Sequence, residues 1–361
     1  MHVRHVAKPL LGAGCTRSLK VGVFIPLSGP AGIWGPSCRS CAELAAEEIN
    51  AAGGIGRRQI EFTFIDAGGI PADVALTASN LVASGKIDAV VGMHTSDVRV
   101  ALAAAVSGQL PYVYTPLYEG GERNPGVFCI GETPGQHLLP ALDWLCERYH
   151  LRRWFLVGND YVWPRATHRV LRRHFSGGPC EIAGEAYLPF GTEDAEELID
   201  EIRQARTDAM LLSLVGQDSV VFNRAFARSG LAPHILRFSC AMEENMLLGI
   251  GDANLDGVFA ASGYFELVDT RANGDFLERY HQRFGDRAPI LNALGESMYE
   301  GVRFLKNLAE SVSDRDWRAL DRSLSTGGVR DAVYDRDRVS RAPTYLAEAQ
   351  GYEFRILRSF P

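Results

Sequence analysis

Polar side chains follow a short apolar run of the sequence, at the point where a predicted strand ends. His94, Thr95 and Ser96 follow Ala89–Gly92, with Met93 between them, and precede a predicted helix. Hydroxyl groups and the free N–H groups at a helix N-terminus bind carbonyl or carboxylate oxygens. Ser96 is equally suited to cap the helix, and one residue can serve both roles. These residues predict a binding site for a small, oxygen-bearing ligand.

Two further groups occupy equivalent positions. Tyr114 and Thr115 end the next predicted strand, and Tyr161 follows a strand in the second half of the chain. Ligands of open α/β sheets bind at the carboxyl ends of the strands, so these loops predict a shared cleft. Gln217, which follows a later strand, completes this predicted ligand-binding set. The alternative is that the aromatic side chains only pad the protein surface.

An acidic side chain in the cleft would distinguish an amino acid ligand from a neutral one. An amino acid needs a carboxylate for its ammonium group, and Glu243 or Glu244 could supply one after the predicted strand that ends near Cys240. Both are equally compatible with exposed acids at the start of a helix. A neutral amide or urea needs only paired hydrogen-bond donors and acceptors.

Other motifs carry little chemistry. Cys38 and Cys41 have redox spacing but lack the residues expected between them, and 252–257 imitates a calcium loop that has Gly263 where a glutamate is required. Hydrolase and metalloprotease motifs are absent. We therefore predict no catalytic residue, metal or cofactor, although an enzyme with unmarked residues remains an alternative. The arginine-rich segment 165–174 is either a solvated helix face or a patch that binds RNA or a partner.

Charge and cysteine usage limit the environment. With 37 basic and 44 acidic residues the net charge is −7, so direct nucleic-acid binding is not expected. Seven cysteines do not form an obvious disulfide framework, and residues 1–17 lack the apolar core of a signal peptide. We expect a cytoplasmic protein without membrane insertion. The alternative is a periplasmic or extracellular protein whose leader has been removed.

These candidate residues need a scaffold of strands and helices. From Lys20, short β-like runs alternate with amphipathic helices, which is typical of an α/β fold with parallel sheets and crossover helices. The same alternation restarts after Thr133. A helix is predicted over 37–52, two long helices over 273–284 and 291–311, and short strands after residue 328. Residues 1–18 are predicted to be a disordered tail.

The segment Ala-Glu-Leu-Ala-Ala-Glu-Glu-Ile-Asn-Ala-Ala-Gly-Gly-Ile at 42–55, with Tyr-Glu-Gly at 118–120 and Gly-Asn-Asp-Tyr at 158–161, resembles a known family. It is similar to the type I periplasmic binding proteins that recognise branched-chain amino acids, urea and amides. The urea and short-chain amide branch is the most similar, and Tyr264-Phe265 adds Tyr264 to the predicted ligand-binding residues. His94 departs from the Tyr or Trp of relatives, which leaves the ligand open.

The resemblance implies two Rossmann-like lobes with parallel central sheets, joined by three hinge crossings. Residues 19–133 and 266–338 would form lobe 1, and residues 134–265 and 339–361 would form lobe 2. It also implies a protein that closes on its ligand without turning it over.

The resemblance leaves the role of the protein open. We expect a cytoplasmic sensor of a small amide that regulates amide- or nitrogen-use genes through a partner such as an antiterminator. The alternative is the substrate-binding component of an ABC transporter, which works with a permease and binds urea, amides or branched-chain amino acids. An enzyme is a second alternative, and a homodimer is also open.

Overall fold

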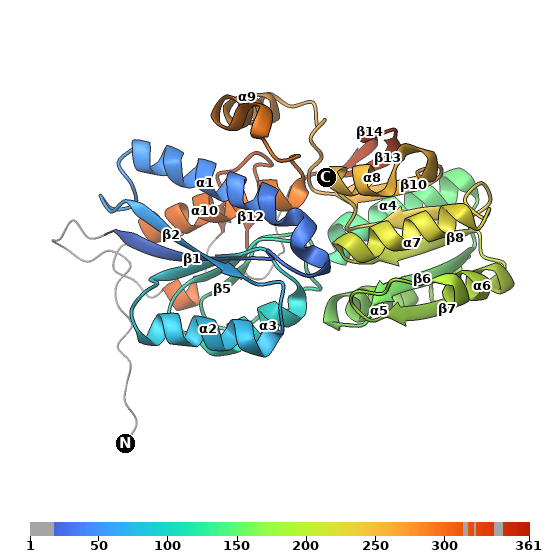
Figure 1. Cartoon of the computed structure of the whole chain (residues 1–361), viewed down its shortest axis with the longest axis horizontal. Helices are drawn as coiled ribbons and strands as arrows, with labels where there is room; N and C mark the ends of the chain where they lie inside the picture. The colour runs from blue at the N-terminus through green and yellow to red at the C-terminus, as the bar shows by residue number, and fades with distance from the viewer. Residues whose placement is uncertain (1–17, 313–316, 321–322, 336–341) are drawn as a thin grey trace, which may run out of the picture.

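Two separate β-sheets form the centres of two lobes. The computed structural model describes residues 18–312, 317–320, 323–335 and 342–361, so the predicted tail falls almost wholly outside the described residues. Lobe 1 lies on the left of Figure 1 and lobe 2, with the green and yellow segments, on the right. This arrangement confirms the predicted α/β fold class.

The sheet of lobe 1 has five parallel strands in the order β2-β1-β3-β4-β5. They are β1 (Leu19–Ile25), β2 (Ile60–Asp66), β3 (Ala89–Gly92), β4 (Tyr112–Tyr114) and β5 (Val127–Cys129). Successive side chains of a strand point to opposite faces. Accordingly, Val23 packs in the core beneath α1 (Gly35–Ala51) and α10 (Ala293–Ser311), and Phe24 in the core beneath α2 (Pro71–Ala83) and α3 (Ser96–Val106). Helices cover both faces, which explains the nearly continuous apolar strands.

The sheet of lobe 2 has seven strands in the order β14-β13-β10-β9-β8-β6-β7. The parallel ones are β6 (Arg153–Asn159), β7 (Glu181–Leu188), β8 (Ala209–Ser213), β9 (Leu236–Ser239) and β10 (Val258–Ser262). The C-terminal β13 (Thr344–Gln350) and β14 (Glu353–Phe360) add an antiparallel edge. Trp154 packs toward α4 (Pro134–Tyr149) and α5 (Val162–Phe175), whereas Phe155 packs toward α6 (Glu196–Ala205) and α7 (Gly216–Arg228).

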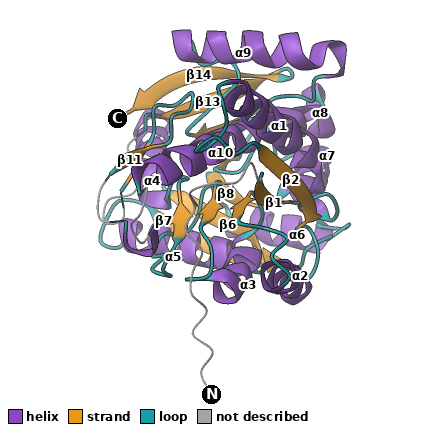
Figure 2. Ribbon diagram, turned by 90° about the vertical axis from the view of Figure 1, so that its left-hand side faces the viewer, coloured by secondary structure: helices purple, strands orange, loops and turns teal. Residues whose placement is uncertain are grey.

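The chain passes between the lobes three times. It enters lobe 2 after β5, returns after β10 to build α9 (Arg271–Phe284) and α10, and enters lobe 2 again before β13. Figure 2 shows α9 lying across the top of the molecule. The boundaries that we predict for the lobes stay predictions, and the third one, at 338 and 339, lies outside the described residues.

The remaining elements are short. They are α8 (Glu244–Ile250), the 3-10 turns η1 (Pro30–Trp34), η2 (Asp252–Asn254), η3 (Gly285–Arg287) and η4 (Trp317–Ala319), and the hairpin strands β11 (Leu324–Ser325) and β12 (Val333–Tyr334). Within the described ranges, no helix is both long enough and apolar enough to cross a bilayer.

Caps set where the late helices begin. The side chain of Thr270 accepts a hydrogen bond from Asn273 N, so α9 starts two residues before the predicted boundary. Asn292 caps α10 in the same way through Gly295 N. An N-cap side chain satisfies one of the N–H groups that have no partner inside the helix.

Candidate functional site

A pocket lies between the lobes, at the carboxyl ends of strands from both sheets. It encloses about 390 Å³ of empty space, counting the part that opens to solvent. It is lined by Trp34, Met93, His94, Thr95, Ser96, Tyr114, Pro116, Leu117, Tyr161, Trp163, Val215, Ala241 and Leu294. Four of these side chains are tryptophan or tyrosine, and none carries a carboxylate, an ammonium or a guanidinium group.

The loop between β3 and α3 forms the polar part of the lining. Thr95 is the N-cap residue of α3 and has an extended backbone, but its side chain makes no capping hydrogen bond. Ser96, the first residue of the helix, is buried. The N-terminus of a helix carries partial positive charge and N–H groups without intrahelical partners. Two hydroxyls and a helix N-terminus therefore meet at the pocket, as the sequence predicts.

His94 is neutral at physiological pH. Burial lowers its pKa to about 4, and the positive charge of Arg99 acts in the same direction. Its Nε2 lies 3.0 Å from the hydroxyl of Tyr112, and its Nδ1 lies 3.2 Å from the carbonyl oxygen of Thr95. The guanidinium of Arg99 is itself paired with Glu119 and Glu122. His94 therefore adds shape and hydrogen bonding to the pocket, and no charge.

Tyr114 connects the second loop to the first. Its hydroxyl donates to the carbonyl oxygen of His94 over 2.8 Å and lies 3.5 Å from the Ser96 hydroxyl. Burial raises the pKa of Tyr114 far above its usual range, so the phenol stays protonated.

Lobe 2 contributes an aromatic wall. Tyr161 is the N-cap residue of α5 and Trp163 lies in its first turn. Their ring centroids are 6.3 Å apart, and the Tyr161 ring also lies 5.1 Å from that of Phe190. Across the cleft, Trp34 at the end of η1 completes the aromatic lining. Such walls suit a flat or branched apolar group.

The predicted ligand-binding residues divide into two sets. The structure brings His94, Thr95, Ser96, Tyr114 and Tyr161 together in the pocket lining. It places four others outside that lining, each with another role or position. These are Thr115, whose hydroxyl lies 3.1 Å from that of Ser297; Gln217, exposed at the start of α7; Glu243; and Tyr264, which donates to Asn273 Oδ1 over 2.8 Å.

Glu243 and Glu244 are not exposed acids, which corrects one of our two interpretations. Both are buried. Glu243 Oε2 accepts the N–H of Ala293 over 3.1 Å, and Glu244 Oε1 accepts the N–H of Glu266 over 2.9 Å. Burial raises the pKa of Glu243 to about 8 and that of Glu244 well above its usual range. Burial therefore disfavours the charged form of both carboxyl groups, and each already accepts a backbone N–H.

The lobes touch each other beside the pocket. Asn245 of α8 donates to the carbonyl oxygen of Ile33 in η1 over 2.9 Å, and its Oδ1 accepts from Asn292 over 3.3 Å. Gly216, at the start of α7, lies against the same turn: a Cβ there would come within 2.2 Å of Pro30 O. These contacts join the two lobes beside the pocket.

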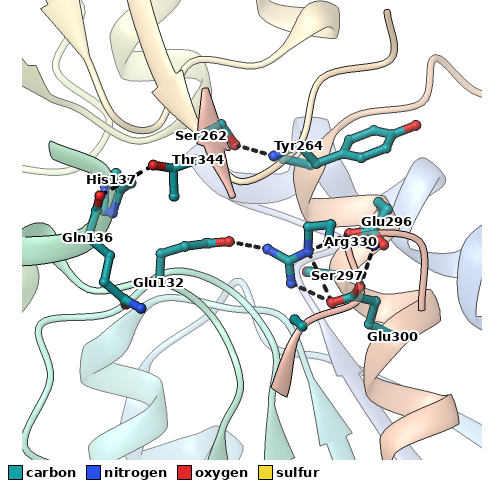
Figure 3. A network of polar contacts seen from close by, with 12 residues as sticks. Glu132, Gln136, His137, Ser262, Tyr264, Glu296, Ser297, Glu300, Arg330 and Thr344 are labelled. Atoms are coloured by element: carbon teal, nitrogen blue, oxygen red, sulfur yellow. Dashed lines mark hydrogen bonds and ion pairs between the residues drawn. The ribbon is translucent and has the colours of Figure 1, made fainter. Parts of the chain in front are cut away.

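A buried ion cluster lies at the hinge (Figure 3). Arg330 binds Glu300 over 2.5 Å, lies 3.1 Å from Glu296 and is paired with Glu132, which precedes α4 at the first crossing. A Cβ on Gly263, in the second crossing, would overlap Glu132 Oε1 at 1.9 Å. Burial and the neighbouring Glu300 raise the pKa of Glu296 well above its usual range. One arginine therefore connects the first crossing to α10, and the second crossing packs closely against Glu132.

The remaining motifs are structural. Burial raises the pKa of both Cys38 and Cys41, the opposite of what a reactive thiol requires. The described part of the chain contains no cluster of side chains arranged to hold a metal ion. On the basic helix α5, Arg165 pairs with Asp160 and Arg172 with Glu185, as on a solvated face.

Sequence reasoning missed several lining residues. Trp34 lies in a Gly- and Pro-rich loop without periodicity, and Leu294 reaches the pocket from a helix that is far away in sequence. Trp163 lies in the same loop as Tyr161, at the carboxyl end of β6. This position could have identified Trp163 as a lining residue from the sequence. Trp34 follows β1, so the same rule of strand ends could have found it.

Two α/β lobes, hinged by three crossings around an aromatic pocket, define a ligand-binding protein of the periplasmic type. The family described as periplasmic binding protein matches residues 18–350. The chain belongs to this family, which confirms the resemblance seen in the sequence.

Relatives agree with this assignment. A Leu/Ile/Val-binding protein homolog 1 of Brucella abortus (strain 2308) is 32% identical over 348 residues, which cover 93% of this chain and 91% of that protein. A Leu/Ile/Val-binding protein homolog 3 of Brucella melitensis is 24% identical over 261 residues, covering 71% of this chain and 66% of that protein. This second match thus spans slightly less than two thirds of the relative.

Solved structures share the fold. A solute-binding protein of an ABC transporter from Rhodopseudomonas palustris HaA2, in complex with p-hydroxybenzoic acid, has a TM-score of 0.84 at 20% identity and covers 95% of this chain and 97% of its own. A branched-chain amino acid transporter substrate-binding protein from Streptococcus pneumoniae, in complex with isoleucine, has a TM-score of 0.81 at 18% identity, with 95% and 99% covered.

These comparisons change two expectations. The predicted cytoplasmic location is wrong, because the family and the relatives are periplasmic binding proteins. The relatives also favour our alternative, a transporter-type binding protein, over the sensor. They are binding proteins and not enzymes by name.

Proposed function

We propose that this protein is an extracytoplasmic receptor that binds a small carboxylic acid without an ammonium group and delivers it to an ABC transporter permease. The names of the relatives support the transporter role. One observation carries the choice of ligand: the pocket combines aromatic walls and a helix N-terminus with no acidic side chain in its lining.

The carboxylate of the ligand would lie at the N-terminus of α3. There the hydroxyls of Thr95 and Ser96 and the helix N–H groups donate hydrogen bonds to an anion. The apolar body would lie among Trp34, Tyr161 and Trp163, which suit an aromatic ring. The aromatic walls and the helix N-terminus together match the ring and the carboxylate of a substituted benzoate.

A branched-chain amino acid is the second candidate, because the curated relatives carry that name. Its ammonium group would enter a pocket whose lining contains no carboxylate. The buried Glu243 and Glu244 lie outside that lining, and both already accept a backbone N–H. A buried charge without a partner is costly, which disfavours this ligand.

A thermal-shift screen tests the proposal. A ligand that binds only the folded protein raises Tm. We expect benzoate and 4-hydroxybenzoate to raise Tm by several degrees at millimolar concentration, and leucine, isoleucine, acetamide and urea to leave it unchanged. A rise in Tm with leucine but with no carboxylic acid would favour a branched-chain amino acid as the ligand. For the transporter role, deletion of the gene should reduce uptake of the labelled acid by the native organism.

A further inference from the structure

Two cysteines of lobe 2 face each other although they lie far apart in sequence. Cys146 is in the last turn of α4, and Cys180 directly precedes β7, the edge strand of the sheet. Their Sγ atoms are 3.5 Å apart, and Cys180 Sγ also lies 3.5 Å from the carbonyl oxygen of Leu151. Both side chains are almost fully buried in the same apolar core, next to Trp154 and Phe175.

We infer that Cys146 and Cys180 form a disulfide bond in the mature protein. A disulfide has an S–S distance of about 2.05 Å, so the two sulfur atoms must approach by only about 1.5 Å. The bond would tie the C-terminal end of α4 to the start of the edge strand. The inference rests on the proposed function in one respect, because an extracytoplasmic protein meets an oxidising environment.

The chemistry needs a thiol oxidant that carries a disulfide of its own, such as a dithiol oxidase of that compartment. One cysteine thiolate attacks the oxidant's disulfide and forms a mixed disulfide, which releases one oxidant thiolate. The second cysteine thiolate then attacks the mixed disulfide at the first cysteine's sulfur. This forms the Cys146–Cys180 bond and releases the second oxidant thiolate. The two protein thiols thereby lose two protons and two electrons, and the oxidant becomes a dithiol.

The folded protein protects this pair from casual exchange. Burial, reinforced by the neighbouring Cys180, raises the pKa of Cys146 to about 12, and only the thiolate is reactive. The bond therefore forms while α4 and β7 are still assembling. Once formed, the bond is accessible to soluble reductants when the protein unfolds.

The other buried cysteines give a matched control. Cys38 and Cys41 lie one turn apart on α1 of lobe 1, with both thiols buried. No contact between their sulfur atoms is found among the described residues, in contrast to the pair in lobe 2. Replacing them by alanine removes two thiols without touching Cys146 or Cys180.

The test uses the full chain, exported to the periplasm of a bacterial host and unfolded in guanidinium with an alkylating agent but no reductant. Peptide mass mapping should show the peptides of Cys146 and Cys180 joined, with both thiols unalkylated. Reduction should lower Tm by roughly 5 °C in the wild type and in the Cys38→Ala/Cys41→Ala variant, but not in the Cys146→Ala/Cys180→Ala variant.

Full alkylation of Cys146 and Cys180, together with a Tm that reductant does not change, would overturn the inference. The same preparation can be exposed to oxidised glutathione during refolding, which should also close the bond. Ligand binding plays no part in these readouts, so their failure would leave the proposed receptor function standing.

Discussion

Tyr114 holds the pocket loop of lobe 1: its hydroxyl donates to the carbonyl oxygen of His94 over 2.8 Å and lies 3.5 Å from the Ser96 hydroxyl. The residues that follow His94 are Thr95 and Ser96, which contribute the two aliphatic hydroxyls of the pocket lining. The position of the loop, and with it the polar half of the site, therefore depends on a side chain from the neighbouring strand β4.

Removal of this hydroxyl should weaken ligand binding. Tyr114→Phe keeps the ring but loses a hydrogen bond of about 1 kcal/mol, so we expect an increase in Kd of about fivefold by calorimetry. Tyr280→Phe is the matched control, since the Tyr280 hydroxyl donates to Pro289 O over the same 2.8 Å but does not line the pocket. Equal Kd values for both variants would contradict the role of Tyr114.

Gly216 permits the close approach of the two lobes beside the pocket. Gly216→Ala would place a methyl group 2.2 Å from Pro30 O in the opposite lobe, so closure should become costly and Kd should rise at least tenfold. Gly230→Ala is the control, because Gly230 shares the positive φ but has nothing within 4 Å of the new Cβ. Both variants should lose similar stability from backbone strain, and only Gly216→Ala should show a more open molecule in small-angle scattering. A normal Kd for Gly216→Ala would show that this contact plays no part in closure.

Glu243 should make stability depend on pH. Its pKa is raised from 4.5 to about 8 by burial, so between these values the folded protein holds a proton that the unfolded chain releases. Its contribution to stability is therefore present at low pH and is lost as the pH rises from 4.5 to 8.

Glu243→Gln removes this dependence and keeps an acceptor for the Ala293 N–H. Relative to the wild type, the free energy of unfolding of the variant should increase progressively as the pH rises through that window. The difference should reach roughly 1–3 kcal/mol at pH 7 in urea denaturation. Glu201→Gln, an exposed position on α6, should show no such divergence. Parallel pH profiles for Glu243→Gln and the wild type would mean that Glu243 is ionised in the folded protein.

Arg330 stabilises the hinge by neutralising buried carboxylates. Arg330→Met should lower the free energy of unfolding by about 3–5 kcal/mol, because Glu132 and Glu300 would keep buried charge without a partner. The loss should be smaller when Glu300→Gln is introduced first, since the two side chains interact directly. Arg355→Met, which breaks an exposed pair with Glu348, should cost less than about 1 kcal/mol. An equal loss in both backgrounds would argue against the cluster.

The sequence predicts five of the thirteen lining residues for one physical reason. Strand ends and helix starts leave local signals, so His94, Thr95, Ser96, Tyr114 and Tyr161 could be found from neighbouring residues. Trp34 and Leu294 could not, because they reach the pocket only through the packing of η1 and α10. The burial of Glu243 and Glu244 is also a tertiary effect, since it depends on contacts with Ala293 and Glu266.

The antiparallel edge of the lobe 2 sheet and the ion cluster at the hinge also depend on contacts between residues that are distant in sequence. β13 and β14 join a sheet whose other strands end about 80 residues earlier, near Ser262. Arg330 meets Glu132 across 198 positions of sequence. The hydrophobic periodicity of a single helix or strand does not predict contacts between residues that lie so far apart in sequence.

The most direct test of the account is a calorimetric comparison of 4-hydroxybenzoate, 4-hydroxybenzamide and leucine. A pocket with a helix N-terminus and no acidic lining should bind the carboxylate at micromolar Kd or tighter, the matched amide at least tenfold more weakly, and leucine not measurably. Tighter binding of leucine than of 4-hydroxybenzoate would contradict the central claim that this site takes an acid without an ammonium group.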